Sequence, residues 1–90
     1  MALTEKRILS LGELAEGAQA RVHQMQGGQA FLGRMATLGF TIGAPLRLLQ
    51  TARRGPVIVL IRGTRVALGR GEALKVLVAP EEGGNEEPQQ

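Results

Sequence analysis

A helical pattern of apolar residues occurs once, in residues 29–38. Phe31, Met35 and Leu38 recur at intervals of four and three, which places them on one face of a helix. Gly39 follows directly and suits the left-handed position that ends many helices. A helix of this length is not stable alone in water, so we expect it to pack against a sheet.

The other apolar segments are short and have the alternation or the β-branched composition of strands. Turns rich in glycine separate them. Residues 57–62 are apolar at nearly every position, so we place this strand centrally in the sheet. We expect a bulge near Met25, which falls out of phase with Val22, and a tight turn at Gly63 and Thr64. The predicted strands cover residues 18–25, 45–50, 57–62, 65–68 and 73–78.

Five short strands, one short helix and tight turns are typical of a small, mainly β protein with a strongly bent antiparallel barrel. Residues 80–90 contain no hydrophobic residue, so we expect a domain of residues 1–79 followed by a disordered acidic tail. The N-terminal segment lacks the apolar run of a signal peptide, and no apolar stretch is long enough to span a bilayer. These features favour a cytoplasmic protein.

The charges of the chain are divided between domain and tail. All 11 basic residues lie in residues 1–79 with four glutamates, which gives the domain a formal charge of +7, whereas the tail carries four glutamates and no basic residue. A basic domain favours an acidic partner: a protein surface, anionic lipid headgroups or nucleic acid. We expect the tail to mask the basic surface weakly. Nucleic-acid binding by a small basic barrel stays open as the alternative, although both aromatic residues, Phe31 and Phe40, are predicted to be core residues and not stacking platforms.

The residue inventory argues against an enzyme. The chain has no Asp, Cys or Tyr, and its only Ser and His are Ser10 and His23, so a Ser-His-Asp triad cannot be assembled. Glu13 and Glu16 are interpreted as a solvated charged face. His23 lacks a second His or Cys for a transition metal site, and binding of a metal ion by the tail glutamates would be weak. No phosphate-binding motif is present, so we expect no cofactor and no small-molecule substrate.

A series of short motifs along residues 9–79 resembles the ferrous iron transport protein A (FeoA) family. The motifs are Leu11-Gly12-Glu13-Leu14 with Gly17, Ala20-Arg21-Val22, Gly27-Gly28, Arg34-Met35-Ala36-Thr37-Leu38-Gly39-Phe40, Gly43, Gly55-Pro56, Ile61-Arg62-Gly63-Thr64-Arg65-Val66-Ala67-Leu68 and Glu72-Ala73. The family fold is an SH3-like barrel with a helix inserted after the first strand, and a related module occurs in iron-dependent repressors. Ile42 stands where the family usually has proline, which suggests a looser turn, and Gly69 and Gly71 are unusual near the last strand.

The resemblance implies a non-enzymatic cytosolic accessory or regulatory protein of ferrous iron uptake. Its partner would be a membrane ferrous iron permease with a cytoplasmic GTPase domain, which would bring it to the inner face of the membrane, and weak self-association is a further expectation. The outer helix face, of small residues, is a candidate docking surface, although an ordinary solvated face is the simpler interpretation; it holds Gln29, Gly33, Ala36 and Thr37. We expect the partner to contact the helix end and the basic turns, through Arg34, Thr37, Leu38, Gly39, Arg53, Arg54, Arg62 and Arg65.

Overall fold

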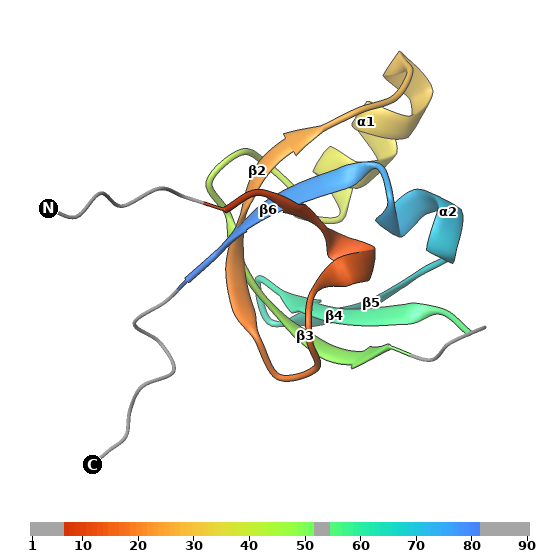
Figure 1. Cartoon of the computed structure of the whole chain (residues 1–90). Helices are drawn as coiled ribbons and strands as arrows, with labels where there is room; N and C mark the ends of the chain where they lie inside the picture. The colour runs from red at the N-terminus through yellow and green to blue at the C-terminus, as the bar shows by residue number, and fades with distance from the viewer. Residues whose placement is uncertain (1–6, 52–54, 82–90) are drawn as a thin grey trace, which may run out of the picture.

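Six short antiparallel strands form one strongly bent sheet in the computed structural model, which describes residues 7–51 and 55–81 (Figure 1). The order of the strands across the sheet is β1-β6-β2-β3-β4-β5. Their bounds are β1 Leu9–Ser10, β2 Gln19–Met25, β3 Pro45–Thr51, β4 Val57–Ile61, β5 Thr64–Leu68 and β6 Val76–Pro80. A 3₁₀ turn, η1 (Leu11–Glu13), follows β1, and the two helices are α1 (Gln29–Thr37) and α2 (Arg70–Ala73). The predicted mainly β barrel with an inserted helix is confirmed.

The core forms where the inward faces of the strands meet the apolar face of α1. β4 shows the alternation clearly, since Val57, Val59 and Ile61 are buried while Ile58 and Leu60 are half-exposed. The sheet is too small to close its core alone, and η1 and α1 add buried side chains to it. The buried hydrophobic residues are Leu11, Leu14, Ala20, Val22, Phe31, Met35, Phe40, Ala44, Leu46, Leu48, Val57, Val59, Ile61, Val66, Leu68, Ala73, Val76 and Val78.

The predicted helix, its end and the predicted bulge in the second strand are confirmed. Gly39 has φ +104°, the backbone N–H of Phe40 donates to the Met35 carbonyl at 2.9 Å, and the N–H of Gly39 donates to the Ala36 carbonyl at 3.0 Å. These two bonds form a Schellman motif. The register between β2 and β6 shifts between Val22 and Gln24, so the sheet bends close to the position where the alternation breaks.

Leu38 is not the core residue that the helical spacing predicts. Phe31 and Met35 are buried, but 36% of Leu38 is exposed. The reason is local: Leu38 is the C-cap of α1, and the chain turns away at Gly39 before its side chain can lie against the sheet. Leu38 is therefore available at the surface beside the helix end.

Two predictions near the last strand are wrong. Residues 70–73 form α2, where Glu72 accepts the backbone N–H of Gly69 at 3.2 Å, and the strand begins only at Val76. Leu74, which we predict to lie in that strand, is consequently 59% exposed at the end of α2. At the other end β6 runs to Pro80, and the N–H of Glu81 donates to the Gln19 carbonyl at 2.8 Å. The rest of the predicted tail, residues 82–90, lies outside the described residues.

Two turns also differ from expectation. The β4–β5 turn consists of Arg62 and Gly63, one residue earlier than predicted, and Arg62 has φ +51°. The turn at Ile42 is not loose, because the N–H of Ala44 donates to the Thr41 carbonyl at 2.9 Å and Gly43 has φ +87°. These values describe a type II turn in which residue 42 occupies the position that favours proline.

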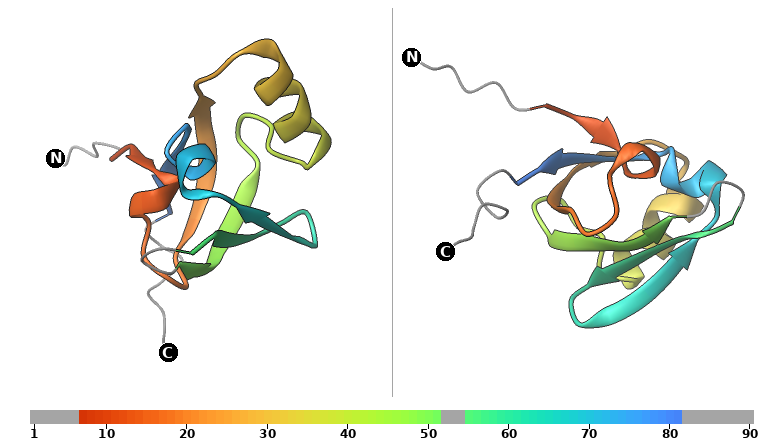
Figure 2. Two further views of the ribbon diagram at one scale, coloured as in Figure 1. Left: turned by 90° about the vertical axis from the view of Figure 1, so that its right-hand side faces the viewer. Right: turned by 60° about the horizontal axis from the view of Figure 1, so that its bottom comes forward.

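The sheet has two unlike ends. β1 is a two-residue strand that the structure adds to the five predicted, and it pairs with β6. β4, which we predict to be central, is paired on both sides but lies next to the last strand. β5 forms the other end: among the described strands it pairs with β4 only, and none of them lies beyond it (Figure 2, right). Within residues 7–51 and 55–81 no helix is long and apolar enough to cross a bilayer.

Candidate functional site

The structure joins the tip of the β4–β5 hairpin to the end of α1 through Arg62. A two-residue turn with φ of +51° at Arg62 and +78° at Gly63 is a type I′ turn, which matches the twist of a hairpin. From this tip the Arg62 Nε donates to the Gly39 carbonyl at 3.2 Å and Nη2 donates to Thr41 Oγ1 at 3.0 Å. Figure 2 (left) shows the hairpin tip below the C-terminal end of α1. Two of the predicted site residues, Arg62 and Gly39, are thus in direct contact.

Close packing at Gly39 leaves no room for a side chain. A Cβ built on Gly39 would lie 3.0 Å from Arg62 Cδ, and the positive φ already disfavours any L-residue there. The guanidinium of Arg62 also lies at the carbonyl end of α1, where the helix dipole favours a cation. Arg62 therefore holds the hairpin tip and the helix end in one fixed arrangement.

Exposed apolar side chains flank this contact. Leu38 is 36% and Ile42 67% exposed, and they lie in sequence on either side of the Gly39–Thr41 segment that Arg62 binds. Thr37, also a predicted site residue, is exposed at the last turn of α1, where its Oγ1 donates to the Gly33 carbonyl at 3.0 Å. The helix end thus offers apolar area beside the Arg62 guanidinium.

Arg34 is engaged elsewhere. Its Nη2 forms an ion pair with Glu72 of α2, and its guanidinium lies 5.9 Å from the centre of the Phe31 ring. The Lys75 ammonium lies 5.0 Å from the same ring centre, so two cations flank one aromatic side chain. Local sequence patterns could not identify Glu72 as a neighbour of α1, because it lies 38 residues from Arg34 along the chain, and Lys75 is farther still.

Basic residues and one apolar residue form a row across the outer face of three strands. Arg47 of β3 lies opposite Leu60 of β4, which in turn lies opposite Arg65 of β5. Directly opposite residues share a face of a sheet, so Leu60 lies between two arginines. An open groove of about 320 Å³ runs over this face and past the hairpin tip, lined by residues that include Arg47, Leu60, Arg62 and Glu81. Of the predicted basic site residues, Arg62 and Arg65 lie on this side, whereas Arg53 and Arg54 lie outside the described residues.

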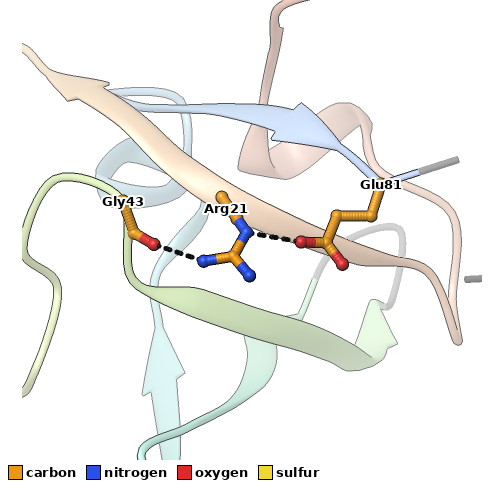
Figure 3. A network of polar contacts seen from close by, with 3 residues as sticks. All are labelled: Arg21, Gly43 and Glu81. Carbon is orange, nitrogen blue, oxygen red and sulfur yellow. Dashed lines mark hydrogen bonds and ion pairs between the residues drawn. The ribbon is translucent and has the colours of Figure 1, made fainter. Parts of the chain in front are cut away.

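Glu81 at the groove is tied to the neighbouring strand by Arg21. Arg21 Nε donates to Glu81 Oε2 at 2.6 Å and Nη1 donates to the Gly43 carbonyl at 3.0 Å (Figure 3). One arginine thus connects the end of β6 with the turn that precedes β3. Arg21 was not among the predicted site residues, and its partners lie 60 and 22 residues away along the chain.

Two glutamates near the start of the domain bind backbone groups. Glu13 accepts the N–H of Ser10 at 3.2 Å and Glu16 accepts the N–H of Thr51 at 2.9 Å, so each carboxylate binds a backbone group. His23 is exposed on β2. Among the described residues, no group of three His, Cys, Asp or Glu side chains could hold a metal ion. Arg62 and Arg65 are both exposed at the β4–β5 hairpin.

The family model of the FeoA domain matches residues 9–80, which is most of the chain. The chain belongs to the FeoA family. It is 34% identical over 71 residues to a candidate Fe(2+) transport protein A of Methanocaldococcus jannaschii, which covers 79% of this chain and 85% of that protein. The family resemblance in the sequence is confirmed.

Solved FeoA structures share the fold. A crystal structure of a FeoA described as an iron uptake regulatory protein superposes with a TM-score of 0.79 at 29% identity, over 83% of this chain and 100% of that one. A zinc-complexed FeoA of Stenotrophomonas maltophilia, described as an SH3 domain protein, gives a TM-score of 0.69 at 31% identity, over 78% and 88% of the two chains. A manganese-dependent transcriptional repressor, at 21% identity and over 45% of its length, shares the fold alone. The SH3-like barrel is thereby confirmed.

Proposed function

We propose that this FeoA-family protein is a non-enzymatic accessory and regulatory protein of ferrous iron uptake that binds the cytoplasmic GTPase domain of a membrane ferrous iron permease. Family membership links the chain to ferrous iron transport. The contact of Arg62 with Gly39 carries the rest of the proposal, since it makes the hairpin tip and the helix end one preformed surface. A preformed surface loses little conformational entropy on binding, which favours a protein partner. The protein then works at the inner face of the membrane through its partner and needs no cofactor.

The proposed docking surface has an apolar part and a basic part. Leu38 supplies exposed apolar area at the helix end, and Arg62 and Arg65 supply positive charge at the hairpin. Gly39 acts through its shape, because it lets Arg62 lie close against the helix end. Arg34 reaches a partner only by sharing or leaving its ion pair with Glu72.

Nucleic acid is the weaker candidate partner. Phe31 is 9% exposed and Phe40 fully buried, and these are the only aromatic residues of the chain, so no ring is available to stack on bases. Binding would then rest on phosphate contacts and be non-specific. A filter-binding titration at about 50 mM salt, where phosphate binding is strongest, should retain no RNA or DNA.

The test of the proposed function is a binding titration with the purified cytoplasmic domain of the permease in its GTP-bound, GDP-bound and nucleotide-free states. We expect micromolar or tighter binding in at least one state. Arg65→Glu should weaken it, because it reverses an exposed charge of the docking surface. Arg7→Glu is the matched control, since Arg7 is exposed beside β1 at the opposite end of the sheet and should leave the affinity unchanged. Absence of binding in all three states would contradict the proposed function.

A further inference from the structure

The backbone of β5 has unused hydrogen-bonding groups along one side. Because Ile61 and Thr64 flank a two-residue turn, they form the first hydrogen-bonded pair of the hairpin. Hydrogen-bonded and non-hydrogen-bonded pairs then alternate, so the N–H and C=O groups of Val66 and Leu68 also point toward β4. Those of Arg65 and Ala67 point away from β4, and no hydrogen bond connects them to another described residue.

We propose that β5 binds an extended segment of the permease's cytoplasmic domain, which adds to the sheet as a seventh strand. This inference rests on the proposed function and specifies how the docking surface is used. Arg65 and Ala67 each offer one donor and one acceptor to such a strand, at the two-residue spacing that an added strand requires. Main-chain pairing of this kind provides affinity, and the side chains beside it provide specificity.

The outer face beside this edge defines the chemistry of the added strand. Arg47, Leu60 and Arg65 form a row across three strands, so the next residue in the row would lie opposite Arg65. An acidic residue there gains a favourable cross-strand charge pair. In the next row on the same face, Ile58 lies opposite Ala67, and both are apolar. This row favours an apolar residue in the added strand, two positions from the acidic residue. We therefore expect the segment to contain an acidic and an apolar residue separated by one position.

Charge disfavours a second copy of this chain as the occupant. Two domains of formal charge +7 repel each other, and a symmetric pairing about Arg65 would place two arginines directly opposite each other. The same arginine that would select an acidic strand therefore opposes pairing of β5 with itself, which is a common protection of exposed sheet edges.

Ala67→Pro tests the inference, because it removes an outward N–H that β4 does not use. Proline is tolerated on edge strands where the missing N–H faces solvent. Ala67→Val is the matched control, since it keeps the N–H and suits a strand. In a titration with the permease's cytoplasmic domain, Ala67→Pro should weaken binding by at least about tenfold, the loss expected for one main-chain hydrogen bond and its unpaired acceptor. Ala67→Val should weaken binding less than Ala67→Pro does, because it keeps the N–H that the added strand would use.

The outcomes separate the two claims. Equal affinity of the wild type and a folded Ala67→Pro overturns strand addition and leaves the proposed function standing, whereas failure of the wild type to bind contradicts the proposed function itself. If the wild type formed a homodimer that Ala67→Pro dissociates, the added strand would come from a second copy of this chain. That result would overturn the proposal that the added strand belongs to the permease. Should Ala67→Pro fail to fold, amide hydrogen exchange of the wild-type chain decides: protection of the Arg65 and Ala67 amides only in the complex supports the inference, and unchanged exchange refutes it.

Discussion

The two edges of the sheet are protected in different ways. β1 is two residues long, and the chain turns at once into η1, whose Leu11 is fully buried. β5 is five residues long, is the last strand at its end of the sheet in the part of the chain that the structure describes, and carries Arg65 as its only charged residue. At the first edge the chain continues from β1 into η1. At the second edge the positive charge of Arg65 opposes pairing of β5 with another basic strand. Among the described residues, β5 thus keeps the outward backbone groups of Arg65 and Ala67 unpaired, at the end of the sheet whose hairpin tip contacts the helix end.

The largest expected effect is at the covered edge. Leu11→Ala removes a fully buried side chain that η1 places against the core, and should lower the free energy of unfolding by about 2–5 kcal/mol. Ile8→Ala, at a position 38% exposed just before β1, is the control and should cost about 1 kcal/mol or less. Urea unfolding of the two variants measures both values. If Leu11→Ala were as mild as Ile8→Ala, η1 would not be a structural cover.

On the opposite side, the contact of Arg62 with the helix end can be broken at Gly39. Gly39→Ala should destabilise the domain by about 1–2 kcal/mol, because an L-residue is strained at this backbone conformation and its Cβ crowds Arg62. Gly33→Ala is the matched substitution within α1. Nothing lies within 4 Å of a Cβ built on Gly33, so alanine should stabilise the helix by about 0.5–1 kcal/mol. The signs of the two changes in urea midpoint should therefore be opposite, and equal signs would contradict this account of the helix end.

A smaller gain is expected in the turn beside the helix end. Ile42 occupies the position of a type II turn that favours proline, and its side chain is 67% exposed, so little packing is lost on substitution. Ile42→Pro should raise the free energy of unfolding by about 0.4–1 kcal/mol, because it restricts the unfolded chain. A thermal unfolding scan would detect the rise in Tm. A lower Tm would mean that the backbone at residue 42 does not fit proline.

The smallest effect should come from the ion pair that joins α1 to α2. The side chains of Arg34 and Glu72 are 55% and 34% exposed. Solvent screens such pairs, and Arg34→Gln should cost less than about 1 kcal/mol. Urea unfolding at low and high salt should give nearly the same difference between variant and wild type. A large, salt-sensitive loss would show that the connection of the two helices depends on this pair.

Local patterns in the sequence predicted four of the six strands closely, α1 and its end at Gly39, because spacing and glycine placement encode them directly. Local patterns also explain the failure at Leu74: the spacing of Gly69 and Glu72 suits a helix start, whereas the alternation of residues 74–78 suggested an earlier strand. The contact of Arg62 with Gly39 could not be predicted. It joins residues 23 positions apart and depends on a positive φ at an arginine, which sequence propensities disfavour.

The candidate site was predicted only in part for the same reason. Sequence alone marks Arg62 and Arg65 as basic residues near a turn, but the row that Arg65 forms with Leu60 and Arg47 follows from strand order and register. The position of the hairpin turn decides which backbone groups of β5 point away from β4. A shift of the turn by one residue would exchange the inward and outward groups. That one-residue difference between the predicted and the observed turn decides which amides face outward.

Residue-specific amide hydrogen exchange of the free protein tests the central claim, that β5 is an open edge, most directly. The Val66 and Leu68 amides donate within the hairpin and should exchange slowly, whereas the Arg65 and Ala67 amides face outward and should exchange at rates close to those of an unstructured peptide. Alternation of slow and fast exchange along β5 is the result that the structure predicts. Slow exchange at all four positions in the monomer would contradict it, because the edge would then already be occupied.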